Sequence, residues 1–212
     1  MIYIAKGQEP DFMRKLRRKG LIYKDLEQPQ YIKKQYTTRI RQVLLAEQHY
    51  LCGYCCERIG VHSSHVEHMH PKSRHQNISL DYYNLIASCM GRGNQTCGKA
   101  KDDQNGEIVY PTDADCEAQF YVRISDGTMQ GRSEKAKHTI DVLNLNAQFL
   151  CDARMGIMYE MAYCSYENVK RDYILSIEEE HWPAFFDVVK YVLQEYAGQW
   201  DAFQYYAQRI YS

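Results

Sequence analysis

The sequence predicts an α+β fold that is mostly helical, with a small metal-stapled core between an N-terminal and a C-terminal helical segment. Apolar residues recur at helical spacing toward both ends, whereas the middle has only short apolar runs and clustered cysteine and histidine residues. Among the 212 residues, 45% are hydrophobic and 25% are charged, which excludes wholesale disorder. We therefore expect three parts, residues 1–50, 51–105 and 106–212.

Residues 1–50 predict a basic helical segment. Asp11 can cap a short helix through MRKLRRKG, which ends at Gly20. The run TTRIRQVLLAEQ keeps apolar residues near helical spacing, and Thr37 or Thr38 can serve as its N-cap. This second helix delivers the chain to the first cysteine.

Residues 106–212 predict a small hairpin followed by helices. The DG turn within residues 106–131 favours the hairpin, and Ser133 caps the helix that follows. Residues 147–175 read as another helix, and a capping box that opens at Ser176 predicts the start of a final amphipathic one.

Charge is distributed unevenly along the chain. Residues 1–101 carry 17 Lys and Arg against 8 Asp and Glu, whereas residues 102–212 carry 9 against 19. This asymmetry predicts that the basic half faces a polyanion such as nucleic acid, and that the acidic half has another role. The alternative is that both halves are simply solvated surface.

The eight cysteines indicate metal binding or burial rather than disulfides, because the N-terminus lacks the features of a signal peptide. Cys52 and Cys55 have knuckle spacing, and Cys89 and Cys97 form a second, wider pair. Four thiolates predict a closed tetrahedral Zn²⁺ site that folds a module too small to build its own core. Cys56 can replace Cys55 through a C-x3-C spacing, or it can be a packed thiol.

The region between these pairs resembles the HNH (ββα-metal) nuclease motif. HVEHMHPKS contains Glu67 followed directly by His68, then come Asn84 and a cysteine-led helix that begins CGKAK. A wider resemblance rests on LLAEQHYLCGYCCERIG, HVEHMHPKSRHQ, LDYYNLIASC, CGKAK and TIDVLNLN with a following Arg154. In these runs the chain is similar to the PtuB-type HNH proteins of Septu-like and retron-associated anti-phage modules.

That resemblance implies a metal-dependent HNH endonuclease that hydrolyses nucleic acid, with DNA favoured and RNA possible, and with a PtuA-like ATPase as partner. It implies that His68 is the general base, since imidazole titrates near pH ~6.5. Glu67 would be a hard oxygen ligand for catalytic Mg²⁺ or a similar divalent cation. Asn84 would hold the loop and orient the base through hydrogen bonds.

The chain departs from the commoner HNH pattern after the fourth cysteine. Relatives often have His or Asn there, whereas this chain has Gly98, which offers no side chain. We predict that Asp102, at i+4 from Gly98 on the same helix face, is the second metal ligand, with Asp103 as the fallback. The candidate phosphate contacts are Lys72, Arg74, Lys99 and Lys101.

Two further histidines are candidates for the site. On a strand, His65 would share a face with Glu67, so it is either a metal ligand, a group that supports a ligand, or a structural histidine. His70 precedes Pro71 and can contact metal or substrate, or lie in a surface loop.

The main alternative function is a non-catalytic zinc module that binds nucleic acid or scaffolds a complex. Such a module would need the cysteine pairs but not Glu67, His68 or Asn84. No apolar run approaches the roughly 18 residues of a membrane span, so we expect a soluble, cytoplasmic protein without a membrane partner.

Overall fold

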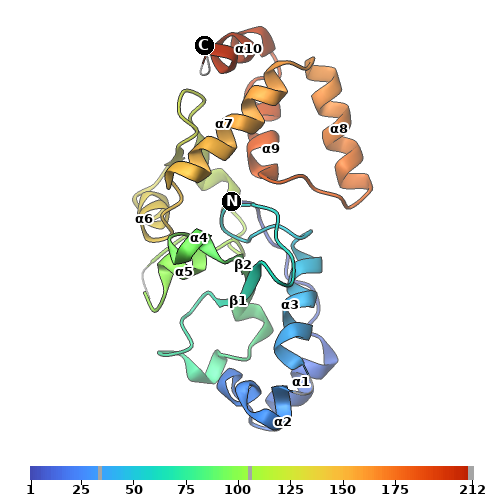
Figure 1. Cartoon of the computed structure of the whole chain (residues 1–212), viewed down its shortest axis with the longest axis vertical. Coiled ribbons are helices and arrows are strands. Elements are labelled where there is room, and N and C mark those ends of the chain that lie inside the picture. Colours follow the sequence, from blue (N-terminus) through green and yellow to red (C-terminus); the bar gives the residue numbers. More distant parts are fainter. Residues whose placement is uncertain (33–34, 105–106, 210–212) are drawn as a thin grey trace.

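The computed structural model describes residues 1–32, 35–104 and 107–209 as an elongated molecule (Figure 1). Helices α1 (Asp11–Arg18) and α2 (Pro29–Ile32) lie at one end of the long axis, and α10 (Trp200–Gln208) lies at the other. The remaining α-helices are α3 (Tyr36–Glu47), α4 (Gly91–Asn94), α5 (Cys97–Lys101), α6 (Glu134–Val142), α7 (Gln148–Ala162), α8 (Tyr166–Glu178) and α9 (Phe186–Glu195). Short 3-10 helices cover Tyr23–Glu27, Gln76–Ile78, Tyr82–Asn84 and Glu117–Gln119.

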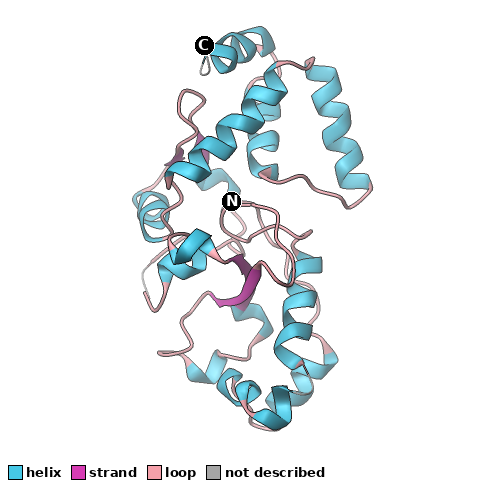
Figure 2. Ribbon diagram, in the orientation of Figure 1, coloured by secondary structure: helices cyan, strands magenta, loops and turns pink. Residues whose placement is uncertain are grey.

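Among the described residues, two small antiparallel sheets accompany the helices, so the predicted α+β class is confirmed (Figure 2). In the centre of the molecule, β1 (Ser64–His68) pairs with β2 (Leu85–Cys89), with Glu67 opposite Ile86. Every residue of β2 is buried, because α5 packs on it and α3 contacts both strands. The central order is therefore strand, strand, helix.

The first ten residues run through the centre of the molecule. The amide of Ile4 donates to the carbonyl of Pro111 at 2.7 Å. Lys6 Nζ contacts Glu47 Oε2 at 2.6 Å and donates to the carbonyl of Leu85 at 3.0 Å. The segment thereby ties α3 and β2 to the chain beyond residue 107, a role that periodicity does not reveal.

Two predicted helix starts in the N-terminal part need correction. Helix α1 begins at Asp11, but its N-cap is Pro10, and the Asp11 carboxylate pairs with Arg14. Helix α3 begins at Tyr36 with Gln35 as N-cap, so Thr37 and Thr38 lie inside the first turn.

In the C-terminal part, the hairpin and its following helix are as predicted. Strands β3 (Phe120–Val122) and β4 (Met129–Gly131) pair antiparallel, and Ser133 Oγ accepts a hydrogen bond from the amide of Ala136 at the start of α6.

The later helices differ from the prediction. The helix expected over 147–175 is two helices, because Ser165 caps a new one by accepting from the amide of Asn168. Ser176 does not start a helix; it lies in the last turn of α8, where its hydroxyl donates to the carbonyl of Tyr173 at 2.7 Å. Short-range cap patterns cannot tell a helix start from a polar residue near a helix end.

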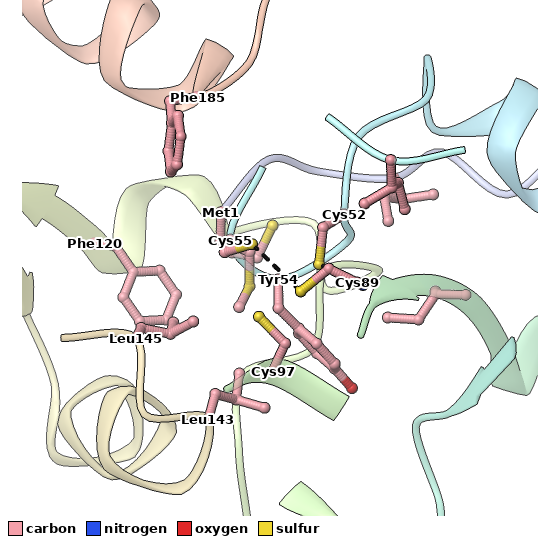
Figure 3. Packing of buried hydrophobic residues seen from close by; sticks show 14 of the residues in the cluster. Met1, Cys52, Tyr54, Cys55, Cys89, Cys97, Phe120, Leu143, Leu145 and Phe185 are labelled. Carbon is pink, nitrogen blue, oxygen red and sulfur yellow. Dashed lines mark hydrogen bonds between the residues drawn. The ribbon is translucent and has the colours of Figure 1, made fainter. Parts of the chain in front are cut away.

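One hydrophobic cluster joins all three parts of the chain. Close to the cysteines, it brings together Met1, Phe120, Leu143 and Phe185, which come from distant parts of the sequence (Figure 3). The buried guanidinium of Arg154 joins α7 to two loops by donating to the carbonyls of Gly127 and Leu145, at 3.1 and 2.8 Å. Across the described residues, no helix has the length and apolar character needed to cross a membrane.

Candidate metal centre and active site

Four cysteines form one buried cluster. The Sγ atoms of Cys52, Cys55, Cys89 and Cys97 all lie within 4.8 Å of one another (Figure 3). Four thiolates at about 2.3 Å from a tetrahedral Zn²⁺ lie roughly 3.8 Å apart, and the Cys55 and Cys89 sulfurs are separated by 3.9 Å. An all-sulfur tetrahedral donor set is typical of structural zinc, so these residues fit the predicted metal.

Backbone hydrogen bonds bring the two pairs together. The amide of Cys56 donates to the carbonyl of Cys52 at 3.0 Å, which closes the first turn, and Gly53 donates to Ala87 of β2 at 3.0 Å. The amide of Cys89 then donates to the Cys52 sulfur at 3.3 Å. The short turn of α4 spans the wider spacing of the second pair, and Cys97 begins α5.

Cys56 lies outside this cluster. It packs with Ile2, Leu51 and Phe186, and burial raises the pKa of its thiol. Its neutral thiol is therefore a packing group, and Cys55 supplies the second sulfur of the first pair.

A hollow of about 310 Å³ opens beside β1 and the start of α5. Its lining combines acidic, basic and imidazole groups from three regions of the sequence. The lining residues are Tyr23, Glu27, Arg41, His65, Val66, Glu67, His68, Pro71, Lys72, Gly98, Lys99, Asp102 and Asp103.

Glu67 is the buried carboxylate of this hollow, with 7% of its surface exposed. Its Oε1 lies 2.9 Å from Lys101 Nζ and accepts from the Tyr54 hydroxyl at 3.3 Å. Its Oε2 lies 3.4 Å from Nε2 of His65. One carboxylate oxygen is thus held by the protein, and the other faces an imidazole.

His68 is held in one orientation at the end of β1. Its Nε2 lies 2.9 Å from the carbonyl oxygen of Ser79, and the Tyr23 ring meets it edge-on at 4.7 Å between centroids. A carbonyl can only accept, so Nε2 carries the proton and Nδ1 keeps the lone pair. Burial lowers the pKa of His68 to about 4, so the neutral imidazole is present at pH 7.

Asn84 joins the two sides of the loop that follows β1. Its Oδ1 accepts from the amide of His70 at 2.8 Å, and its Nδ2 donates to the carbonyl of His70 at 3.1 Å. A further contact from Nδ2 reaches the carbonyl of Ile78 at 3.4 Å. The loop that presents His68 is therefore tied to the start of β2.

The predicted basic contacts divide into three groups. Lys72 and Lys99 line the hollow, and Arg74 is exposed but not in its lining. Lys101, by contrast, is 1% exposed. Its ammonium forms an ion pair with Glu67 and donates a hydrogen bond to the carbonyl of His68 at 3.0 Å. Lys101 therefore faces the interior and not an incoming phosphate.

The remaining predicted residues are placed as follows. His70 is not among the lining residues of the hollow, and its ring centroid lies 5.1 Å from that of Tyr110. Asp102 and Asp103 are exposed at the rim. The i+4 spacing predicts that Asp102 lies on the same helix face as Gly98. Helix α5 instead ends at Lys101, and Asp102 has a φ of 46°, so Asp102 does not continue that face.

Several side chains of the site were not expected from the sequence. Tyr23 and Arg41 come from the N-terminal segment and line the hollow, and Tyr54 lies inside the first cysteine pair, facing Glu67. A tyrosine between two metal-binding cysteines and an arginine within an amphipathic helix carry no distinctive spacing, so only the tertiary structure reveals them.

The fold and the site thus define an α+β protein in which a four-cysteine cluster adjoins a hollow containing Glu67 and His68. No protein-family model matches the chain. It is 36% identical to the "Retron Vc95 putative HNH endonuclease" of Vibrio cholerae over 123 residues, covering 52% of this chain and 59% of that protein. It is 32% identical over 109 residues to the "Septu protein PtuB" of Bacillus thuringiensis, covering 50% of this chain and 41% of that protein.

A longer match, 24% identical over 203 residues, joins the chain to the "Retron Ec83 putative HNH endonuclease" of Escherichia coli, covering 73% of this chain and 79% of that protein. The first two matches span about half the length of those relatives. The predicted resemblance is confirmed: the chain is a relative of the retron and Septu PtuB-type HNH proteins.

The cysteine cluster gives a direct prediction about zinc content. We expect Cys89→Ser to lose its zinc and to lower the melting temperature by roughly 10 °C or more, because metal binding contributes to folding. Zinc per chain by mass spectrometry and the melting temperature are the measurements. Cys56→Ser is the matched control and should keep its zinc; zinc loss in that variant, or a full complement in Cys89→Ser, would contradict the ligand set.

Proposed function

We propose that the chain is a metal-dependent HNH endonuclease that hydrolyses nucleic-acid phosphodiester bonds, with DNA favoured over RNA. The observation that carries this proposal is the pair of Glu67 and His68 at one hollow, a buried carboxylate beside a neutral imidazole held by Ser79. The relatives named as HNH endonucleases support the same class of activity.

His68 is the proposed general base. Because Nε2 donates to the carbonyl of Ser79, Nδ1 has the free lone pair that can take a proton from water. The resulting hydroxide forms the new bond to phosphorus, and the bond to the 3′ oxygen breaks. The low pKa of His68 keeps the imidazole unprotonated at neutral pH.

Glu67 is the proposed carboxylate ligand of a divalent cation, and His65, Asp102 and the fallback Asp103 are further side chains of the hollow that can add a donor. Such a cation supplies electrostatic stabilisation of the charge that builds up on the phosphate and on the departing oxygen. Asn84 is a proposed positioning residue, since the hydrogen bonds of its side-chain amide hold the loop that directly follows His68.

Lys72 and Lys99 are the proposed phosphate contacts at the hollow, and Arg41 adds a third cation to its wall. Arg74 is proposed to contact the backbone of the substrate farther out. Lys101 forms a buried ion pair with Glu67, so we propose that this lysine orients the carboxylate and does not contact phosphate.

Replacing His68 tests the enzyme class. We expect His68→Ala to keep its zinc but to lose cleavage by at least 100-fold, the contribution of a general base, in assays of matched DNA and RNA substrates with added divalent cation. Cleavage rates are measured with and without a co-expressed ATPase partner, so that a chain that needs this partner for activity is also tested.

The substrate that the wild type cuts decides between DNA and RNA. Activity of His68→Ala equal to wild type would refute the role of His68. If the zinc-loaded, folded wild type binds nucleic acid but cuts neither substrate under any of these conditions, the non-catalytic zinc module becomes the better description.

Substituting the two lysines of the hollow tests the nucleic-acid contacts. Each phosphate contact releases about one counterion, so Lys72→Ala combined with Lys99→Ala should make the negative slope of log affinity against log salt shallower by about 2. Binding is measured by fluorescence anisotropy with a labelled duplex. The control pair, Lys135→Ala with Lys137→Ala, removes two exposed lysines of α6 in the acidic half and should leave the slope unchanged; an equal effect of both pairs would refute a specific contact.

We also propose that residues 106–212 bind a PtuA-like ATPase, which would make the chain an effector of an anti-phage defence complex. This proposal is supported by the Septu relative, the excess of acidic residues in this part, and a group of exposed apolar side chains on its helices. These are Tyr163, Ile174, Leu175, Ile177, Tyr205 and Tyr206.

Helix α8 provides the test of this docking surface. Ile174→Glu with Ile177→Glu should weaken association with a co-expressed partner at least tenfold, because interface affinity rests on a few buried apolar groups. The control is Ile32→Glu, which changes a 57% exposed isoleucine in the N-terminal segment. Co-purification is the measurement. Unchanged association of the α8 variant, or of a chain truncated at about residue 130, would contradict the proposal.

A further inference from the structure

The first residue after Cys97 has no room for a side chain. A Cβ atom at Gly98 would lie 2.5 Å from Oε2 of Glu67 and 3.0 Å from Nε2 of His65. Carbon atoms do not approach oxygen this closely without displacement. Helix α5 therefore begins so near to β1 that position 98 cannot offer a metal ligand while Glu67 and His65 keep their places.

His65 occupies the space that such a ligand would use. It lies two residues before Glu67 on β1, so the two side chains share one face of the strand. Its Nε2 is 3.4 Å from Oε2 of Glu67. Two donors bound to one divalent cation at about 2.1 Å lie roughly 3 Å apart, so this pair has nearly the spacing of adjacent ligands.

The two oxygens of Glu67 have different surroundings. Oε1 contacts Lys101 and Tyr54, whereas Oε2 faces the imidazole of His65. The oxygen that remains available for a cation is thus the one that faces a second donor.

Asp102 does not complete this pair. Within residues 1–32, 35–104 and 107–209, the four-cysteine cluster is the one group of three or more potential ligands whose donor atoms lie within 4.8 Å of one another. The carboxylate of Asp102 is therefore not close to both Glu67 and His65, although it lines the same hollow.

We propose that His65, through Nε2, is the second side-chain ligand of the divalent cation beside Glu67, and that Gly98 makes room for it. This inference rests on the nuclease proposed above. It changes the expected metal, because a site with an imidazole ligand favours Mn²⁺, Co²⁺ or Ni²⁺ over Mg²⁺, which prefers oxygen donors.

Mn²⁺ binding to the zinc-loaded full chain tests the proposal without any measurement of cleavage. In wild type we expect the echo-modulated electron paramagnetic resonance spectrum of bound Mn²⁺ to contain the nitrogen coupling of a coordinated imidazole. His65→Ala should lose this coupling and weaken Mn²⁺ binding at least tenfold. His65→Gln, which keeps most of the side-chain volume, should lose the coupling too and serves if the alanine variant does not fold.

Two other variants separate this proposal from its neighbours. Asp102→Ala should keep both the nitrogen coupling and the affinity for Mn²⁺, and His68→Ala should keep the coupling even though it is expected to abolish cleavage. Nitrogen coupling that survives in both His65 variants, a wild-type spectrum without it, or loss of Mn²⁺ binding in Asp102→Ala alone would overturn the assignment. A wild type that binds Mn²⁺ through His65 but cuts nothing would leave the assignment standing and refute the nuclease.

Discussion

The close approach of α5 to the β1–β2 pair is the constraint on which the rest of the site depends. The cysteine cluster lies at one end of this contact, where Cys97 opens the helix and Cys89 ends the strand. From that anchor, the next residues of the helix meet β1 with Gly98 against Glu67 and with Lys101 reaching back to the same carboxylate. A metal bound by the four thiolates would reinforce this geometry at a point where the hydrophobic cluster shared by all three parts of the chain already packs. One short helix, α5, thus connects the cysteine cluster with the hollow that contains Glu67.

The buried charge of Glu67 has a definite use in this arrangement. Burying a carboxylate is costly unless it is paired and hydrogen-bonded, and here Lys101 and Tyr54 both act on Oε1. Since both partners hold the same oxygen, the carboxylate is oriented without being fully consumed, and Oε2 stays directed at His65. His68 is treated in the opposite way, because burial favours its neutral form and outweighs the hydrogen bond to the Ser79 carbonyl, which alone would raise its pKa. Two adjacent residues of one strand are therefore held differently, the carboxylate by an ion pair with Lys101 and the imidazole in its neutral form.

Much of the local structure could be predicted from the sequence, because it depends on patterns a few residues long. The cysteine pairs, the hairpin within residues 106–131 and the Ser133 cap all belong to this group. The boundaries that failed, at Ser165 and Ser176, are positions where a serine has more than one local hydrogen-bonding option. The contacts that define the site escaped prediction for another reason. Tyr23, Arg41 and Tyr54 reach the hollow or its carboxylate through packing between distant segments, and the space at Gly98 depends on the separation of a helix and a strand. Sequence spacing alone does not encode that distance.

The uneven charge of the chain is also a matter of geometry. The basic helix α1 and the acidic helices α8 to α10 lie toward opposite ends of the long axis, with β1 and β2 between them (Figure 1). At physiological ionic strength, interactions between exposed charges fade beyond about 8 Å. The acidic end therefore has little effect on a polyanion bound at the hollow. What a phosphate at the hollow meets instead are the local groups, Lys72, Lys99 and Arg41, against the rim carboxylates of Glu27 and Asp103. Because these opposing charges share one opening, a cation bound beside Glu67 would tip the local balance toward an anionic substrate, so metal loading and substrate binding should be coupled at this site.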